Sequence, residues 1–252
     1  MMNKLFPVLF CFLVTCAGLQ AQQLYNLSLD DWSKEGKVWY PYAAGARKIW
    51  DSGNKGTTTL GINVTLPEEE FVAVKGAGKK AACMKSAFVG VIGIGKFAAG
   101  SIYTGQFLKM VGTSGAQLGA GVPFTHRPKA LHGYYAYTPG KIDYVDKTLS
   151  TLKGKMDEGG IEIYLATWTE PFVIDTAKDI ALTPKADGVV GYGTLTLNKA
   201  TDGYVEFTIP VSYTSDATPT YIVIMASSSR WGAHFTGSTQ SVLYLDEMDL
   251  KY

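Results

Sequence analysis

Residues 159–168 read GGIEIYLATW and determine the fold class, because apolar side chains recur there at every second position. This alternation is typical of a β-strand with one face in a hydrophobic core. The side chains expected in the core are Ile161, Ile163 and Leu165, and those expected on the opposite face are Glu162, Tyr164 and Ala166. The stretch therefore predicts a half-buried antiparallel strand.

The same period recurs on both sides of this stretch. Residues 203–213, GYVEFTIPVSY, alternate in the same way, and residues 95–109, 218–229 and 241–252 also favour strands. Turn-forming sequences such as DSGNKG, TPGK, DEGG and KATDGY separate these segments. After residue 21 no long amphipathic helical period occurs. The sequence predicts an all-β fold, a jelly roll or β-sandwich of mainly antiparallel strands.

The N-terminal stretch predicts export. Lys4 precedes an apolar run from Leu5 to Val14 and small residues near Ala21, which is the pattern of a signal peptide over residues 1–21. The run is too short for a transmembrane helix, which needs roughly 20 apolar residues. Residues 22–252 are then expected to form one domain in the periplasm, outside the cell or at the outer membrane. The alternative is a lipoprotein that is cleaved before Cys16 and lipidated there.

Cysteine usage indicates how the fold is stabilised, and net charge indicates which partners to expect. Residues 22–252 contain only Cys83, so stability has to come from the core rather than from a disulfide bond. Lys4 is the only charged residue in the leader, which leaves 22 of the 23 basic residues and all 22 acidic residues after it. A net charge of zero gives no electrostatic reason to expect nucleic acid or an anionic membrane as a partner.

Several motifs that resemble enzyme sites are incomplete. GVIGIGKF, residues 90–97, has the glycines and lysine of a phosphate-binding loop, but Phe97 replaces the hydroxyl residue. The chain has no GxSxG motif, and neither the histidine spacing nor Cys83 matches a zinc site. A glycosidase needs only two carboxyl groups across a cleft. The candidates for such a pair are Glu162, Glu170, Glu206 and Asp246.

Aromatic residues provide the strongest functional signal. In the strand expected near residues 131–137, Tyr135 and Tyr137 fall on one face and Tyr134 on the other. Trp168 shares the face of Glu162 in the strand described first. Flat rings beside carboxyl and hydroxyl groups suit a sugar, which has an apolar face and a rim of hydroxyls. The alternative is that these rings pack in a second, minor core or under a loop.

Four segments together resemble a known family. They are IWDSGNKG at 49–56, GKFAAGSIYTGQF at 95–107, GVPFTHRPKALHGYYAYTPG at 121–140 and the C-terminal stretch from Ser227 to Tyr252. In this order they are similar to the putative carbohydrate metabolism domain, abbreviated PCMD. The resemblance implies a β jelly roll exported by Gram-negative bacteria that degrade carbohydrates, with a role in binding or processing glycans. It implies no catalytic residues.

The chain departs from the family's pattern near the C-terminus. Where the family commonly has Gly-Asp before an aromatic residue and a Gly-Gly pair, this chain has Gly232, Ala233, His234 and Phe235, followed by Gly237 and Ser238. Any function of that acid, in holding a metal or a sugar hydroxyl, is lost with Ala233. The glycines keep their expected role in turns.

These observations lead to an expected glycan-binding protein of low affinity, without cofactors. The alternative to an absence of cofactors is a structural Ca²⁺, although no loop offers a dense acidic cluster. The alternatives are a glycoside hydrolase and a structural or adhesion protein of the cell envelope. The residues expected to contact ligand are Trp50, Asn54, Arg127, Tyr134, Tyr135, Tyr137, Glu162, Trp168, Arg230, Trp231 and His234.

Overall fold

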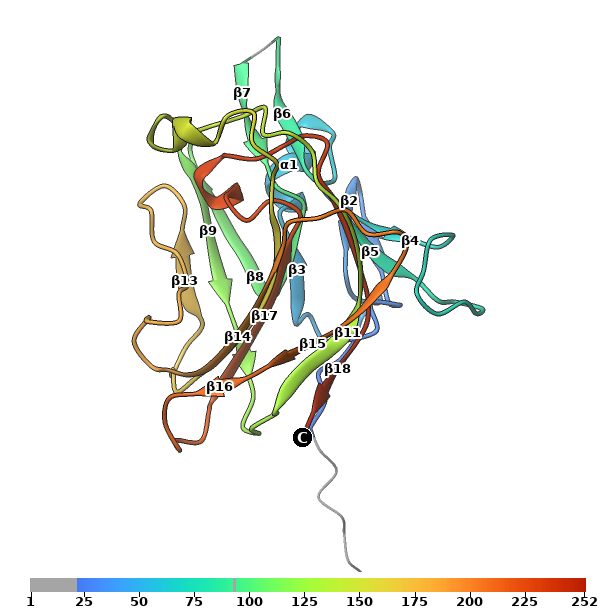
Figure 1. Cartoon of the computed structure of the whole chain (residues 1–252), viewed down its shortest axis with the longest axis vertical. Coiled ribbons are helices and arrows are strands. Elements are labelled where there is room, and N and C mark those ends of the chain that lie inside the picture. The colour runs from blue at the N-terminus through green and yellow to red at the C-terminus, as the bar shows by residue number, and fades with distance from the viewer. Residues whose placement is uncertain (1–21, 93) are drawn as a thin grey trace, which may run out of the picture.

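The fold consists of two antiparallel β-sheets that face each other, seen edge-on in the computed structural model of Figure 1. The structure describes residues 22–92 and 94–252. The signal peptide and the lipidation alternative concern residues 1–21 and therefore lie outside the described residues. No helix in the described part of the chain is long and apolar enough to cross a membrane.

The large sheet has the strand order β13-β9-β8-β17-β12-β14-β16, with β10 paired to β17 and β3 paired to β8. Its strands are β3 (Trp50–Ser52), β8 (Ser101–Val111), β9 (Gly115–Ala120), β10 (Val122–Pro123), β12 (Gly159–Ala166), β13 (Phe172–Asp175), β14 (Val189–Leu197), β16 (Ser212–Tyr213) and β17 (Tyr221–Ser227). Strand β8 joins two parts of this sheet, because its first residues pair with β17 and its later residues pair with β9.

The small sheet has the order β15-β11-β18-β5-β4. Its strands are β4 (Thr65–Glu68), β5 (Ala81–Lys85), β11 (Ala130–Thr138), β15 (Val205–Pro210) and β18 (Val242–Lys251). Two separate hairpins accompany the sheets. They consist of β1 (Ser33–Glu35) with β2 (Val38–Tyr40), and of β6 (Ala87–Val91) with β7 (Ile94–Ala98).

The helices are short. They are the α-helix α1 (Asn54–Thr57) and the 3₁₀ helices η1 (Thr58–Leu60), η2 (Lys147–Leu152) and η3 (Gly232–His234). Among the described residues, strands thus supply nearly all of the regular structure. The expectation of an all-β sandwich or jelly roll of mainly antiparallel strands is confirmed.

The core lies between the two sheets. Ile161, Ile163 and Leu165 of β12 are completely buried, as their alternation predicts, and Leu243 and Leu245 of β18 face them from the small sheet. A second cluster lies on the other face of the large sheet. It contains Tyr164, Ile174, Leu182 and Val223, with Trp168 and Phe172 packed against them.

Strand β11 settles which of its tyrosines face the core. Tyr137 is 1% exposed and donates its hydroxyl to the Ser228 carbonyl at 3.0 Å. Tyr135 is partly buried and packs against the main core. Tyr134 lies on the outer face, where its ring contacts His132. The expectation of ligand contact is therefore corrected for Tyr137, whose ring is part of the core.

Trp50 and Asn54 also need correction as ligand-binding residues. Trp50 is 1% exposed and donates its indole N–H to the Tyr25 carbonyl at 2.9 Å. Asn54 is 1% exposed. Its side-chain amide donates hydrogen bonds to the carbonyls of Trp39 and Thr65 and accepts one from the Thr65 N–H. Both side chains are used to join neighbouring segments of this chain, which leaves no surface for a ligand.

Candidate functional site

A groove of about 760 Å³ lies on the face of the large sheet that points away from the small sheet. Its floor comes from residues of β8, β9, β12 and β17. Ile161 of β12 and Ile224 of β17 face the main core on the opposite side of the sheet. The β6–β7 hairpin, the α1 and η1 turns and the loop at 229–235 form its rim. The volume falls within the range of roughly 300–1,000 Å³ that is usual for small-molecule sites.

The groove is mostly apolar. Its walls include Phe107, Leu118, Ile174 and Met225, which come from four different strands. It runs into the second hydrophobic cluster, since Leu118, Ile174 and Met225 belong to both. An apolar surface with a few fixed polar groups is typical of ligand sites.

Glu162 places a carboxyl group in this groove. The side chain is half-buried, and burial raises its pKa from the usual range. Two contacts act against this shift: a hydrogen bond from the Tyr164 hydroxyl to Oε2 at 3.0 Å, and the positive charge of Arg230. Glu162 is the only carboxyl residue among the described residues that line the groove.

Arg230 stands at the groove's rim. Its guanidinium donates to Glu158 Oε2 at 3.2 Å and to Thr196 Oγ1 at 3.3 Å, and it lies over the Trp231 ring. A partly exposed guanidinium that is held in this way can donate further hydrogen bonds to a ligand.

Tyr103 forms another part of the groove's wall. It is 3% exposed, and its buried hydroxyl has no hydrogen-bond partner among the described residues. Burial raises the pKa of this hydroxyl well above its usual value, so it remains a donor at neutral pH. Tyr103 and Phe107 were not among the residues expected to contact ligand. Both belong to β8, and the alternation of side chains along this strand is the sequence signal that could have identified them.

The structure brings together only part of the expected ligand set. Glu162 and Arg230 meet at the groove. Trp231 and His234 lie in the segment that forms its rim, and His234 Nδ1 is 3.1 Å from Asp179 Oδ1. Trp168 packs against the second cluster, and its indole N–H donates to the Asp187 carbonyl at 2.6 Å.

Other expected residues lie away from the groove. Arg127 stacks on Tyr213 at 3.9 Å and donates to the carbonyls of Ser215 and Ala217. Glu206 belongs to the small sheet, where its Oε1 is 2.7 Å from His132 Nε2. Asp246 is buried in the small sheet as well, and Glu170 is exposed in the connection from β12 to β13. The four candidate carboxyl groups therefore do not form a shared cluster.

Among the described residues, no group of three or more His, Cys, Asp or Glu side chains is arranged to bind a metal ion. Both the expectation of no cofactor and the alternative of a structural Ca²⁺ stay predictions.

Comparisons with known proteins agree on fold and family. A family model described as "Putative carbohydrate metabolism domain" matches residues 28–251. A crystal structure of a putative glycoside hydrolase from Bacteroides thetaiotaomicron is 23% identical, with a TM-score of 0.67, and the match covers 89% of this chain and 70% of that one. Another from Bacteroides vulgatus is 20% identical, with a TM-score of 0.66 and coverage of 88% and 94%. No curated protein matches the sequence.

Proposed function

Because the chain belongs to the family of the putative carbohydrate metabolism domain, we propose that it is an exported glycan-binding protein and that the groove over the large sheet holds the glycan. One observation carries this proposal: a groove of about 760 Å³ that combines apolar walls with Glu162 and Arg230. The walls suit the apolar face of a sugar ring. The carboxyl group accepts hydrogen bonds from sugar hydroxyls, and the guanidinium donates to them.

The expected affinity is weak, on the order of micromolar to millimolar, because a few hydrogen bonds and apolar contacts must offset the loss of glycan freedom. Export is proposed from the signal-peptide pattern in the sequence of residues 1–21. Cys83 is the only cysteine of the described residues, and it is free and half-buried, so the fold is stabilised by its core in an oxidising compartment too.

Glycoside hydrolysis is the second candidate, and the raised pKa of Glu162 favours it, since such a carboxyl can act as a general acid. The solved structures of similar fold are described as putative glycoside hydrolases. Hydrolysis, however, requires a second carboxyl group across the substrate. The described residues that line the groove supply only Glu162, which favours binding without catalysis.

The proposal is tested by calorimetry with purified plant and host polysaccharides, after a glycan array has selected the ligands. Glu162→Gln removes the charge and keeps the shape, and it should weaken binding about tenfold, which corresponds to about 1.4 kcal/mol. Gly160→Phe should abolish binding, because Gly160 lines the groove and a Cβ at this position meets no atom nearer than 3.9 Å, so the ring can occupy the groove. Its fold should be unchanged by circular dichroism.

The matched control is Glu170→Gln, which makes the same chemical change at an exposed position outside the groove and should leave binding intact. Absence of binding to every polysaccharide would overturn the proposal. Release of short sugars by the wild-type protein, lost in Glu162→Gln, would replace binding by hydrolysis. Chromatography of the incubated polysaccharides separates these outcomes.

A further inference from the structure

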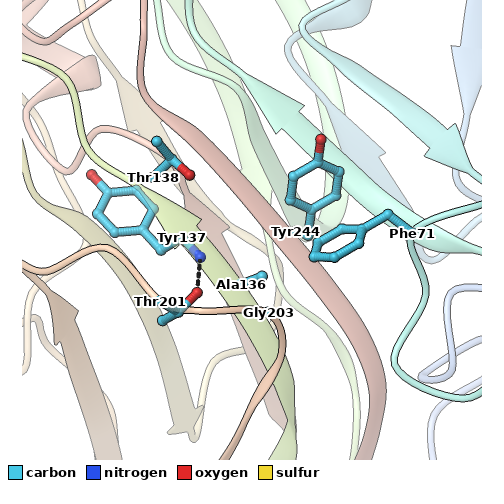
Figure 2. A pocket seen from close by; sticks show the side chains of 7 residues that line it. All are labelled: Phe71, Ala136, Tyr137, Thr138, Thr201, Gly203 and Tyr244. Carbon is cyan, nitrogen blue, oxygen red and sulfur yellow. Dashed lines mark hydrogen bonds between the residues drawn. The ribbon is translucent and has the colours of Figure 1, made fainter.

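The small sheet carries a second hollow on its outer face. This small-sheet pocket has a volume of about 290 Å³ and is lined by Phe71, Ala136, Tyr137, Thr138, Thr201, Gly203 and Tyr244 (Figure 2). Along β11, Tyr135 and Tyr137 direct their rings toward the core, so Ala136 and Thr138 face the other way. The pocket is therefore separated from the groove by the core of the sandwich.

The shape of the small-sheet pocket results from a small residue between large ones. In Figure 2, Phe71 and Tyr244 stand together on one side, Thr138 and Thr201 stand on the other, and Ala136 lies between them. Ala136 and Tyr244 are cross-strand partners in β11 and β18. Because Ala136 contributes only a methyl group beside these two aromatic rings, a hollow remains above it.

The side opposite the rings is polar but uncharged. Thr201 Oγ1 accepts a hydrogen bond from the Tyr137 backbone N–H at 2.9 Å, so the hydroxyl proton of Thr201 remains for donation. Thr138 is exposed and presents a second hydroxyl. None of the described residues that line the pocket carries a charge. The pocket thus favours a neutral ligand with one apolar face and hydroxyl groups at its edge.

The aromatic wall is fixed before any ligand arrives. Phe71 belongs to the loop between β4 and β5 and stacks on Tyr204, with 4.8 Å between ring centroids. The Tyr204 hydroxyl donates to the Phe71 carbonyl at 2.9 Å, and the Ala73 N–H donates to Asp246 Oδ2 at 2.7 Å. Because these contacts hold the loop on the sheet, little further ordering is needed when a ring packs against Phe71.

We propose that the small-sheet pocket is a second sugar-binding site, which takes a single neutral pyranose residue. Its volume lies near the lower end of the roughly 300–1,000 Å³ range for ligand sites, so one ring fits rather than a chain. The inference extends the proposed glycan binding to the opposite face, but it does not require binding in the groove, because the two sites share no residue. Two sites on opposite faces allow one molecule to bridge two glycan segments, which raises avidity.

The test uses the groove-blocked variant Gly160→Phe, so that only the small-sheet pocket can respond. Neutral methyl glycosides of glucose, galactose, mannose and xylose are titrated into the labelled protein and followed by amide NMR. At least one glycoside should shift the amides around Ala136, Thr138 and Gly203, with a dissociation constant on the order of millimolar.

Two further variants in the same background locate the site. Ala136→Leu fills the pocket and Phe71→Ala removes one ring, and each should weaken the titration at least tenfold. The control is Thr208→Leu, which adds comparable bulk at an exposed residue of β15 outside the pocket and should change nothing. Shifts that persist in both pocket variants, or no shift with any of the four glycosides, would overturn the proposal. Failure of the groove would instead appear as unshifted amides around Glu162 in the wild-type protein.

Discussion

At the scale of single residues, buried polar atoms without a hydrogen-bond partner distinguish this protein. Among the described residues these atoms are Ser33 Oγ, the Tyr103 hydroxyl and Asp246 Oδ1, and the last two bear on the proposed sites. An unsatisfied buried polar group costs about 1–3 kcal/mol of stability. The two atoms lie beside different sites, since Tyr103 belongs to the groove's wall and Asp246 anchors the loop that carries Phe71. Both sites therefore lie beside groups that lower the stability of the fold.

Asp246 should make stability depend on pH in a direction unusual for an aspartate. Burial raises its pKa to about 6, the charges of Glu247 and Asp30 add to the shift, and the Ala73 N–H opposes it. Because the folded pKa lies above the unfolded value of about 3.9, the folded state holds the proton more tightly. The stabilisation from the protonated carboxyl is complete below about pH 4 and disappears as pH rises to about 6.

We predict that Asp246→Asn stabilises the protein at pH 7 by about 2 kcal/mol and has little effect at pH 4. Urea unfolding of both proteins across this range measures the difference, which should grow between about pH 4 and about pH 6 and then remain constant. A difference that is the same at every pH would contradict the raised pKa. Comparing variant with wild type removes the contribution of the other carboxyl groups, such as Asp30 and Asp175, whose pKa values are lowered.

At the scale of elements, alternation in the sequence predicts the strands well. Strand β12 has the expected core face, and Phe207 and Ile209 of β15 are buried as their pattern predicts. Alternation cannot say which strands become neighbours. Glu162 lies opposite Met225 of β17 and Thr194 of β14, and these pairings bring together residues more than 30 positions apart. Glu162 was therefore predictable as a candidate, while most of its neighbours in the groove were not.

The β6–β7 hairpin shows why a motif can mislead. The glycines of GVIGIGKF match those of a phosphate-binding loop, but Gly90 and Gly95 face each other across the two strands of a hairpin. A Cβ at Gly95 would stand 2.2 Å from the Val89 carbonyl oxygen. The glycines thus permit two strands to approach closely, and Ile94 and Phe97 of the same hairpin line the groove.

Gly95→Ala should accordingly disturb the hairpin and weaken glycan binding in the groove about tenfold, with the rest of the sandwich intact. Hydrogen exchange should show lost protection at β6 and β7 and unchanged protection at β12. The control is Gly119→Ala in β9, where the new methyl group meets its nearest atom at 3.5 Å, an ordinary contact. Unchanged exchange and binding in Gly95→Ala would show that the hairpin does not shape the groove.

At the scale of the whole molecule, charge is balanced. Residues 22–252 carry 22 basic and 22 acidic side chains, and the groove offers Glu162 together with Lys96 and Arg230. Long-range attraction of a charged polymer is therefore not expected to drive binding.

Glycan affinity should change by less than about twofold when sodium chloride rises from about 50 mM to about 500 mM, because the contacts are hydrogen bonds and apolar packing. Calorimetry with one polysaccharide at both concentrations measures this effect. A steep loss of affinity at high salt would indicate an acidic glycan held by Arg230. The variant Arg230→Gln would then abolish the salt dependence.

The fold class and several side chains that face away from the core were predictable from the amino-acid sequence, because strand alternation is a local property of the backbone. The sequence also identified the family through four separated segments. The burial of Trp50, Asn54 and Tyr137 became visible only in the folded chain. The same holds for the groove that Glu162 and Arg230 share, and for the hollow at Ala136 beside Phe71 and Tyr244. These results depend on pairing between strands distant in the chain, and burial and proximity follow from that pairing rather than from residue type.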